Sequence, residues 1–276
     1  MTAIRTKEIG WNHPETVEFY EAFCQRHDRY AIANGHLIAQ AELIDDQRIL
    51  DVAAGTGRTS AAVLASGICP GSILCFEPAA AMLAVGRQRL SAANVEWTEQ
   101  FPSSGEFDRI LCGAAIWQLS PLDQTIARLS KLLAPGGSLC FNIPALYLGE
   151  PDSPGDGKDP LLFDLLNILS RDRERDSSVG PPVDEPTSQA AASLSIEVVE
   201  SMLRTCGLHS EWRRFQLRFD QTCLREWLKI PILTNRLLSG RNSAERARLI
   251  DEACQQVDPT SYRWERWVSW RAGRVV

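Results

Sequence analysis

No apolar run in the 276-residue sequence reaches the roughly 18 residues that a membrane-spanning helix needs. The first eight residues also lack the apolar core of a secretory signal peptide. Basic residues are fewer than acidic ones, 29 against 35, and the formal net charge of −6 argues against broad nucleic-acid binding through phosphate contacts. We therefore expect a cytoplasmic protein that binds neither a membrane nor nucleic acid.

Clustered metal ligands are missing as well. The eight cysteines include no C-x-x-C pair, and the four histidines have no spacing that would complete a metal site. Several cysteines lie inside apolar runs, where a reduced thiol packs as a small hydrophobe. The sequence therefore predicts no metal centre and no disulfide framework.

What the sequence does contain is a strand, a glycine turn and a helix in succession. Residues 48–52 are predicted as a strand, in which Ile49, Leu50 and Val52 are apolar and Asp51 lies near the end. Residues 53–57 are small and rich in glycine, and residues 58–65 have a helical composition. Glycine lets the backbone approach a ligand closely, because it has no Cβ. This succession predicts a cofactor cradle in an α/β sheet, and Asp51 suits a ligand with a positive charge.

The same alternation continues beyond the cradle. Further strands are predicted at 72–76, 94–97, 107–112 and 138–143, with helices between most of them. Alternating strands and helices indicate parallel pairing and a sheet that is covered on both faces. We predict an α/β fold with a Rossmann-like, doubly wound, mostly parallel seven-stranded sheet, in which residues 262–271 close the sheet as an edge strand.

The chain is predicted to be one domain with four parts. Residues 1–47 form an N-terminal helical cap, residues 48–147 the core, and residues 195–276 the remaining strands and helices. Residues 148–194 interrupt the alternation with proline- and glycine-rich segments around a short apolar helix at 161–169. A long insertion of this kind in a compact domain is usually a lid or a disordered segment, and the apolar helix favours a lid.

Four motifs occur in a fixed order along the core. The first motif runs from Asp51 to Gly57, and the second consists of Glu77, Pro78 and residues 81–83. The third comprises residues 107–111 with the following residues 112–117, and the fourth comprises residues 132–139. In these motifs the chain resembles the class I S-adenosylmethionine-dependent methyltransferases, particularly those that act on small molecules. The resemblance is close over residues 48–147 and general over residues 191–276. Ala53 stands where many members of the family have the first glycine.

The resemblance implies S-adenosylmethionine as the cofactor and a role for each matching residue. Asp51 would face the ammonium group, and Glu77, which lies 20 positions after Gly57, would accept from both ribose hydroxyls. The remaining cofactor-binding candidates are backbone positions of the turn, contacts to the adenine and the residues after the fourth core strand: Ala53, Gly55, Gly57, Pro78, Met82, Glu99, Gln100, Cys112 and Gly113.

The sequence offers fewer motifs for the residues that would bind the methyl acceptor. Trp117 is the best candidate for a substrate wall, followed by Tyr20, Tyr30 and Tyr147. His13 is the best candidate for a general base, although methyl transfer needs one only when the nucleophile must lose a proton early. These aromatic residues and the apolar lid predict a small hydrophobic or aromatic substrate, such as a natural-product intermediate of secondary metabolism. A homodimer is an alternative to a monomer.

Two other interpretations stay open. An enzyme of the same fold could keep S-adenosylmethionine and catalyse a cyclisation or decarboxylation instead of methyl transfer. An NAD-dependent oxidoreductase shares the strand, the turn and the acid after the second strand, but it should carry Gly-x-Gly-x-x-Gly. Residues 55–60 end this pattern with Ser60, which counts against that interpretation.

Overall fold

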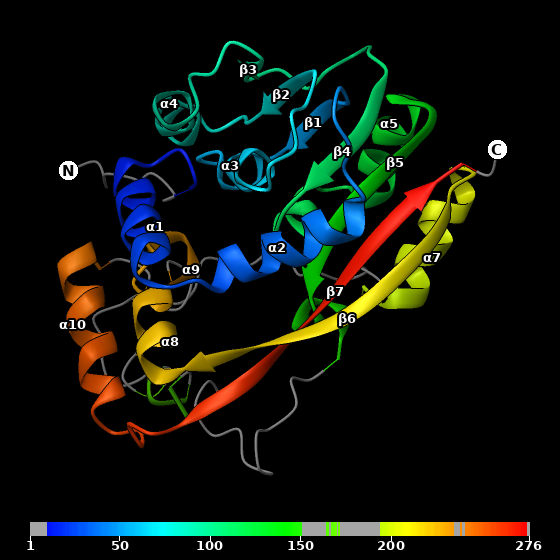
Figure 1. Cartoon of the computed structure of the whole chain (residues 1–276). Helices are drawn as coiled ribbons and strands as arrows, with labels where there is room; N and C mark the ends of the chain where they lie inside the picture. The colour runs from blue at the N-terminus through cyan, green and yellow to red at the C-terminus, as the bar shows by residue number, and fades with distance from the viewer. Residues whose placement is uncertain are drawn as a thin grey trace, which may run out of the picture. The chain divides into compact units, whose positions relative to one another are not determined.

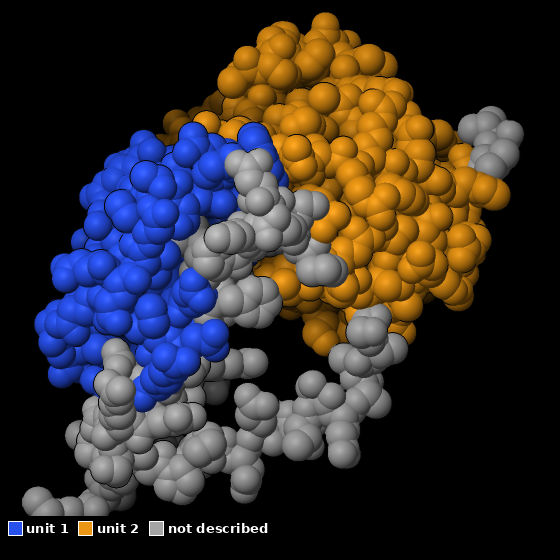
Figure 2. Space-filling view, turned by 90° about the horizontal axis from the view of Figure 1, so that it is seen from below, with its two compact units in different colours: residues 1–27, 153–191, 218–264 blue, residues 28–152, 192–217, 265–276 orange. Residues whose placement is uncertain are grey.

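The computed structural model describes residues 10–150, 164–165, 167–169, 171, 194–234, 238 and 241–274. The chain divides into two compact units, which Figure 2 colours orange and blue. The orange unit comprises residues 28–152, 192–217 and 265–276, and the blue unit comprises residues 1–27, 153–191 and 218–264. The predicted four-part single domain stays a prediction.

A seven-stranded sheet has the strand order β3-β2-β1-β4-β5-β7-β6. Its strands are β1 (Arg48–Val52), β2 (Ser72–Phe76), β3 (Val95–Thr98), β4 (Phe107–Cys112), β5 (Leu133–Pro144), β6 (His209–Asp220) and β7 (Tyr262–Gly273). The pairs among β1 to β5 are parallel, whereas β7 runs antiparallel to β5, with Ser138 opposite Gly273. The predicted Rossmann-like, mostly parallel seven-stranded sheet is confirmed.

Helices follow the strands in the order that the alternation predicts (Figure 1). The structure gives their bounds as α1 (Pro14–Arg26), α2 (Arg29–Ala41), α3 (Arg58–Ala65), α4 (Ala80–Arg89), α5 (Leu122–Lys131), α7 (Ile196–Thr205), α8 (Gln221–Leu228), α9 (Pro231–Thr234) and α10 (Ser243–Cys254). Two short 3-10 helices, η1 (Ile116–Gln118) and η2 (Ala145–Leu148), come directly after the turn that follows β4 and after β5. None of the helices in the described part of the chain is long and apolar enough to cross a membrane.

Alternate residues of the strands bury opposite faces of the sheet. Ile49 packs with residues of α2 and α3, including Leu37 and Val63, whereas its neighbour Leu50 packs in a cluster with Leu129 of α5 and residues of α7. A strand that is buried on both faces must be apolar at nearly every position, which explains the continuous apolar runs in the sequence. The two helical layers therefore hold β1 and β4 in the middle of the sheet (Figure 1).

Two details of the sheet differ from the prediction. The strand predicted to close the sheet at 262–271 is not an edge strand, because β7 lies between β5 and β6 and β6 is the edge. The strand predicted at 138–143 begins earlier, because residues 133–137 also belong to β5, whose pairing with β4 shifts register between Phe107 and Arg109. Alternating β-forming residues predict a strand but do not reveal which strands flank it, because neighbours in a sheet are chosen by tertiary packing.

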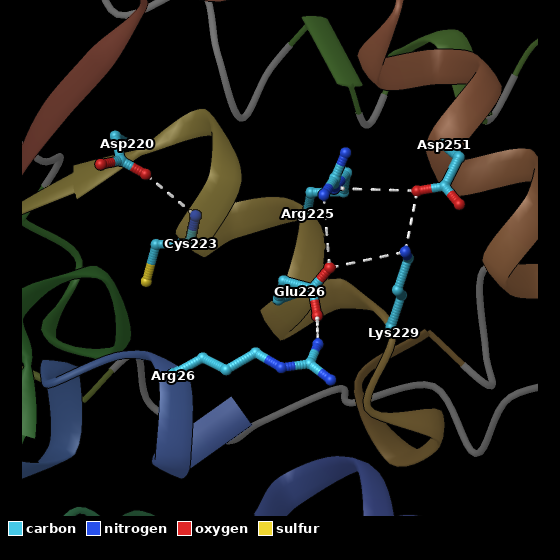
Figure 3. A network of polar contacts seen from close by, with 7 residues as sticks. All are labelled: Arg26, Asp220, Cys223, Arg225, Glu226, Lys229 and Asp251. Carbon is cyan, nitrogen blue, oxygen red and sulfur yellow. Dashed lines mark hydrogen bonds and ion pairs between the residues drawn. The ribbon is translucent and has the colours of Figure 1, made fainter. Parts of the chain in front are cut away.

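The unit that Figure 2 colours blue contains α1, α8, α9 and α10, and a network of ion pairs connects α8 with α1 and α10 (Figure 3). Glu226 of α8 pairs with Arg26 at the end of α1 (2.7 Å) and with Arg225 and Lys229 (3.5 and 3.6 Å). Lys229 also pairs with Asp251 of α10 (2.8 Å). The network therefore links α8 to α1 and to α10.

The predicted lid at 148–194 lies mostly outside the described residues. Within it, residues 164–165, 167–169 and 171 are helical, in agreement with the predicted apolar helix, and Leu165 and Leu169 are fully buried. The role of this segment as a lid stays a prediction.

Candidate functional site

The turn between β1 and α3 bends the backbone into left-handed conformations. The φ angle is 53° at Ala53, 56° at Gly55 and 80° at Gly57. Such angles cost a residue with a side chain roughly 1–2 kcal/mol, whereas glycine adopts them freely. A Cβ on Gly57 would also lie 3.0 Å from Leu90 and 3.1 Å from Trp97. Gly55 and Gly57 therefore meet a geometric requirement, and Ala53 holds a strained conformation.

Asp51, near the end of β1, is fixed to the first turns of α3. The Ser60 backbone N–H (3.1 Å) and the Ser60 hydroxyl (2.6 Å) both donate to Asp51 Oδ2. Asp51 is only 1% exposed, and its Oδ1 is buried without a hydrogen-bond partner among the residues that the structure describes. Burial raises the pKa of Asp51 to about 7, against the lowering effect of the Ser60 bonds. An orphaned carboxylate oxygen is costly, so this one suits a cationic ligand group.

Glu77, the residue after β2, faces the same turn. The backbone N–H of Gly55 donates to Glu77 Oε2, and the N–H of Ala79 donates to Oε1, both at 2.8 Å. Burial raises the pKa of Glu77, whereas the two backbone bonds lower it. A carboxylate oxygen can accept more than one hydrogen bond, so Glu77 retains the capacity to accept from the two hydroxyls of a diol.

These two carboxylates lie at the point where the sheet changes direction. The chain runs from β1 outward to β2 and β3 and then returns to β4 on the other side of β1. Open α/β sheets bind ligands at the carboxyl ends of the strands beside this point. The orphaned oxygen of Asp51 and the spare acceptors of Glu77 therefore fit the ammonium group and the ribose diol of S-adenosylmethionine.

The candidates for the adenine end are dispersed around β2 and β3. Met82 is buried, and its Cε lies 4.0 Å from where a Cβ on Gly55 would be, so its side chain faces the turn. Pro78 is exposed, as are Glu99 and Gln100 beyond the end of β3. The structure brings Met82 to the cradle, while the adenine-binding roles of all four residues stay predictions.

The turn after β4 lies against the start of α3 and against α2. Cys112 is fully buried in the core, and both Asp51 and Glu77 contribute to the raised pKa of its thiol, after burial itself. A Cβ on Gly113 would lie 2.5 Å from both Asn34 Oδ1 and Thr59 Oγ1. Only glycine fits between these side chains, so the turn approaches both helices through its backbone.

Sequence reasoning missed three polar residues around this turn. Asn34 and Thr59 flank Gly113, and the Thr59 hydroxyl donates to Asn34 Oδ1 (3.4 Å). Asn142, within β5, is fully buried and accepts a hydrogen bond from the Ala114 backbone N–H (2.7 Å). The one available signal was an amide between Phe141 and Ile143 in an otherwise apolar strand. A buried amide needs specific partners, but the sequence does not identify them.

Two of the predicted substrate residues come together directly. Trp117 of η1 and Tyr147 of η2 stack with ring centroids 5.0 Å apart and an angle of 23° between their planes. Trp117 also packs edge-on against the buried Trp267 of β7, with ring centroids 6.4 Å apart. Leu146 and Tyr147 are exposed, at 48% and 42%, so the aromatic surface is open on one side. Trp117 and Tyr147 therefore form an aromatic wall beyond the carboxyl ends of β4 and β5.

A buried ion pair supports this wall. Arg29 of α2 and Glu265 of β7 form two hydrogen bonds (2.8 and 2.5 Å), and both side chains are almost fully buried. The guanidinium of Arg29 also lies over the rings of Tyr30 (4.8 Å) and Trp267 (5.1 Å). Desolvation raises the pKa of the Tyr147 phenol, and the charges of Arg29 and Glu265 act on it in opposite directions. The predicted residue Tyr30 thus belongs to the same assembly.

His13 and Tyr20 belong to the other compact unit. His13 stands at the N-cap position of α1 but makes no side-chain cap bond, and its Nδ1 is buried without a partner among the described residues. Tyr20 packs edge-on against Trp11, with ring centroids 5.8 Å apart. The catalytic role of His13 and the substrate role of Tyr20 stay predictions.

Comparison with known proteins identifies the core. Residues 49–137 match the family model described as a methyltransferase domain. A trans-aconitate 2-methyltransferase from Deinococcus radiodurans is 34% identical over 99 residues, which are 36% of this chain and 38% of that protein. The chain thus matches less than half the length of this curated relative.

Solved structures match over more of the chain. The YcgJ protein from Bacillus subtilis has a TM-score of 0.54 at 18% identity, covering 89% of this chain and 100% of that one. A Haemonchus contortus phosphoethanolamine N-methyltransferase 2, in complex with phosphomonomethylethanolamine and S-adenosylhomocysteine, has a TM-score of 0.51 at 16% identity and covers 88% and 52%. At these identities the two likenesses show the fold.

Proposed function

We propose that this chain, whose residues 49–137 match a methyltransferase-domain model, is a class I S-adenosylmethionine-dependent methyltransferase that methylates a small hydrophobic or aromatic molecule on oxygen, nitrogen or carbon. The observation that carries the proposal is the pair of buried carboxylates, Asp51 and Glu77, beside the glycine turn. The hydrogen bonds of both carboxyls among the described residues come from neutral N–H and O–H donors, and neither carboxyl forms an ion pair with a described lysine or arginine. A cationic ligand group would therefore meet carboxyls that no cation of the described residues has already paired.

The chain's own residues would hold the cofactor along this edge of the sheet. Asp51 Oδ1 would accept from the ammonium group, Glu77 would accept from the ribose hydroxyls, and Gly55 and Gly57 would let the backbone come close to the cofactor. Bound S-adenosylmethionine supplies an electrophilic methyl group on a sulfonium. The enzyme's work is then to align the acceptor in line with the methyl group and to exclude water.

The acceptor is proposed to lie against Trp117 and Tyr147. Their stacked rings offer a flat apolar surface, which favours a planar hydrophobic or aromatic substrate such as a natural-product intermediate. The family match covers residues 49–137 and includes neither Tyr30 nor Tyr147. The match to the methyltransferase-domain model therefore supports the cofactor half of the site more than the choice of substrate.

His13 is the proposed general base. A base is needed only when the acceptor must lose a proton before the methyl group is transferred. We retain His13 for this role because its Nδ1 is buried without a partner among the described residues. We also retain three predictions from the sequence: that the protein is cytoplasmic, that it acts in secondary metabolism, and that it forms a homodimer.

The two alternative functions make different demands on the site. A cyclase or decarboxylase of this fold would bind S-adenosylmethionine and release no S-adenosylhomocysteine. An NAD-dependent oxidoreductase would use the third glycine of its motif for close helix packing. Here Ser60 stands at that position, and its hydroxyl bonds Asp51 at 2.6 Å, so the position serves a carboxylate instead.

Calorimetric titration of the full chain with S-adenosylmethionine, S-adenosylhomocysteine and NAD separates these functions. We expect binding of the first two and no response to NAD. Tight NAD binding without a response to S-adenosylmethionine would overturn the proposal. Release of S-adenosylhomocysteine in the presence of a panel of small aromatic acceptors then distinguishes methyl transfer from the other reactions of this fold.

Glu77→Ala tests the assignment after β2. We expect cofactor binding to weaken by roughly 1–3 kcal/mol, the scale of lost hydrogen bonds to a charged group. Glu96→Ala is the control, because Glu96 is an exposed carboxylate on the neighbouring strand β3. If both variants bind the cofactor like the wild type, the assignment of Glu77 is wrong.

A further inference from the structure

Asn142 is a polar side chain without contact to solvent in the middle of the sheet. It lies in β5, is 0% exposed, and uses both ends of its amide. Its Oδ1 accepts from the Ala114 backbone N–H (2.7 Å), and its Nδ2 donates to the Ala33 carbonyl (3.0 Å). One side chain thus connects the turn after β4 with α2, across 28 and 109 residues of sequence.

The residue that Asn142 holds has a strained backbone. Ala114 has a φ of 55°, in the left-handed region, where a residue with a Cβ is disfavoured by roughly 1–2 kcal/mol. Such a conformation persists only where the surrounding structure enforces it. The bond from the Ala114 N–H to Asn142 is a direct means of doing so, because it is short and lies in a dry environment.

The neighbouring residue has little freedom to absorb a change. Gly113 is closely flanked by Asn34 of α2 and Thr59 of α3, each 2.5 Å from the position of an added Cβ. If Ala114 relaxed to a negative φ, the direction of the chain at Gly113 would change where it passes these side chains. The shape of the turn and the seating of α2 beside it therefore depend on the same amide.

We propose that Asn142 is a positioning residue, which holds the turn after β4 in the shape that receives the cofactor and connects α2 to that turn. This inference rests on the proposed function, because the resemblance to the methyltransferases makes Cys112 and Gly113 of this turn candidates for cofactor binding. Asn142 acts through Ala114 and Ala33 and need not touch the cofactor itself.

The test compares the affinity for S-adenosylhomocysteine in variants of Asn142 and Ala114. Asn142→Ala removes both bonds, and we expect the affinity for S-adenosylhomocysteine, measured by calorimetry, to fall about tenfold. Ala114→Gly alone should stay within about twofold of the wild type, because glycine takes a positive φ without support. In the double variant, Ala114→Gly should restore most of the lost affinity, because the turn no longer needs Asn142 to hold its strained residue.

Gln40→Ala is the matched control. Gln40 is also a buried amide on α2 and donates to a backbone carbonyl, that of Glu211 (3.3 Å), on the edge strand β6. We expect this variant to unfold at a lower temperature and to bind S-adenosylhomocysteine like the wild type. If Asn142→Ala does not fold, Asn142→Ser replaces it, because a serine hydroxyl is too short to reach both partners and should show the same rescue by Ala114→Gly.

The outcomes separate this inference from the proposed function. Wild-type affinity in the folded Asn142 variant, or failure of Ala114→Gly to restore it, overturns the positioning role while the methyltransferase proposal stands. Failure of the wild-type chain to bind S-adenosylhomocysteine overturns the proposed function and this inference with it. A loss of affinity in Gln40→Ala as large as that in Asn142→Ala would show a general effect of loosening α2 and would also overturn the inference.

Discussion

The two compact units hold their key carboxylates in opposite ways. In one, Asp51 and Glu77 are 1% and 6% exposed, and their described hydrogen bonds come from neutral N–H and O–H donors. In the other, Glu226 lies between three cations: Arg26 of α1 at 2.7 Å, Arg225 of α8 at 3.5 Å, and Lys229, directly after α8, at 3.6 Å (Figure 3).

This difference distinguishes a binding site from a structural contact. The neighbouring cations already balance the charge of Glu226. Its ion pairs connect helices, and the carboxylate needs no cationic ligand. The charges of Asp51 and Glu77 are removed from water and opposed only by dipoles, which destabilises the ionised forms and raises both pKa values. A protein that retains such groups has a use for them, and a cationic ligand is the simplest one.

Replacing the orphaned carboxylate should have the largest effect. Asp51→Asn keeps the shape of the side chain and removes its charge, so we expect the affinity for S-adenosylmethionine to fall roughly 10- to 100-fold in calorimetry. Asp108→Asn is the control, since Asp108 lies near the opposite end of the neighbouring strand β4 and accepts from the Arg48 N–H (2.8 Å). Equal affinities for Asp51→Asn and the wild type would show that the Asp51 carboxylate does not bind the cofactor.

The pH dependence of stability should show the next largest effect. Because the folded-state pKa of Asp51 is about 7, above the ordinary value of 3.8, the folded protein without cofactor keeps a proton that the unfolded chain releases. Its contribution to stability is therefore complete below about pH 4 and is lost as the pH rises to about 7. At pH 8 we expect Asp51→Asn to be more stable than the wild type by on the order of 2 kcal/mol.

Urea unfolding of both proteins between pH 5 and 8 measures this difference. The gap should widen up to about pH 7 and then level off, and saturating S-adenosylmethionine should narrow it, because the bound ammonium stabilises the ionised carboxyl only in the wild type. A gap that does not change with pH would mean that Asp51 is ionised throughout this range in the folded protein.

The smallest effect is expected in the ion-pair network. Glu226→Gln should lower the free energy of unfolding by about 1 kcal/mol at low salt and by less at high salt, because partly exposed ion pairs are screened. Cofactor affinity should not change. Glu252→Gln, which removes one exposed pair with Arg248 on α10, is the control and should cost about 0.5 kcal/mol or less. Loss of cofactor binding in Glu226→Gln would show that the network does more than connect helices.

The cradle was predictable because its parts are local. The apolar run of β1, the glycines of the turn and the start of α3 follow one another within 18 residues, and each has its own composition. The position of β7 was not predictable. The sequence at 262–271 indicates a strand, but its buried Glu265 finds its partner Arg29 at a separation of 236 residues, which no local pattern records.

The sequence by itself therefore determined the order of strands and helices, the glycine turn and the two acids at the ends of β1 and β2, because backbone preferences and apolar periodicity act over a few residues. Only the tertiary structure decided that β7 lies inside the sheet, that Trp117 meets Tyr147, and that Asn142 clamps Ala114 to α2. These contacts join distant segments, and a buried polar group takes whichever partner the packing of those segments supplies.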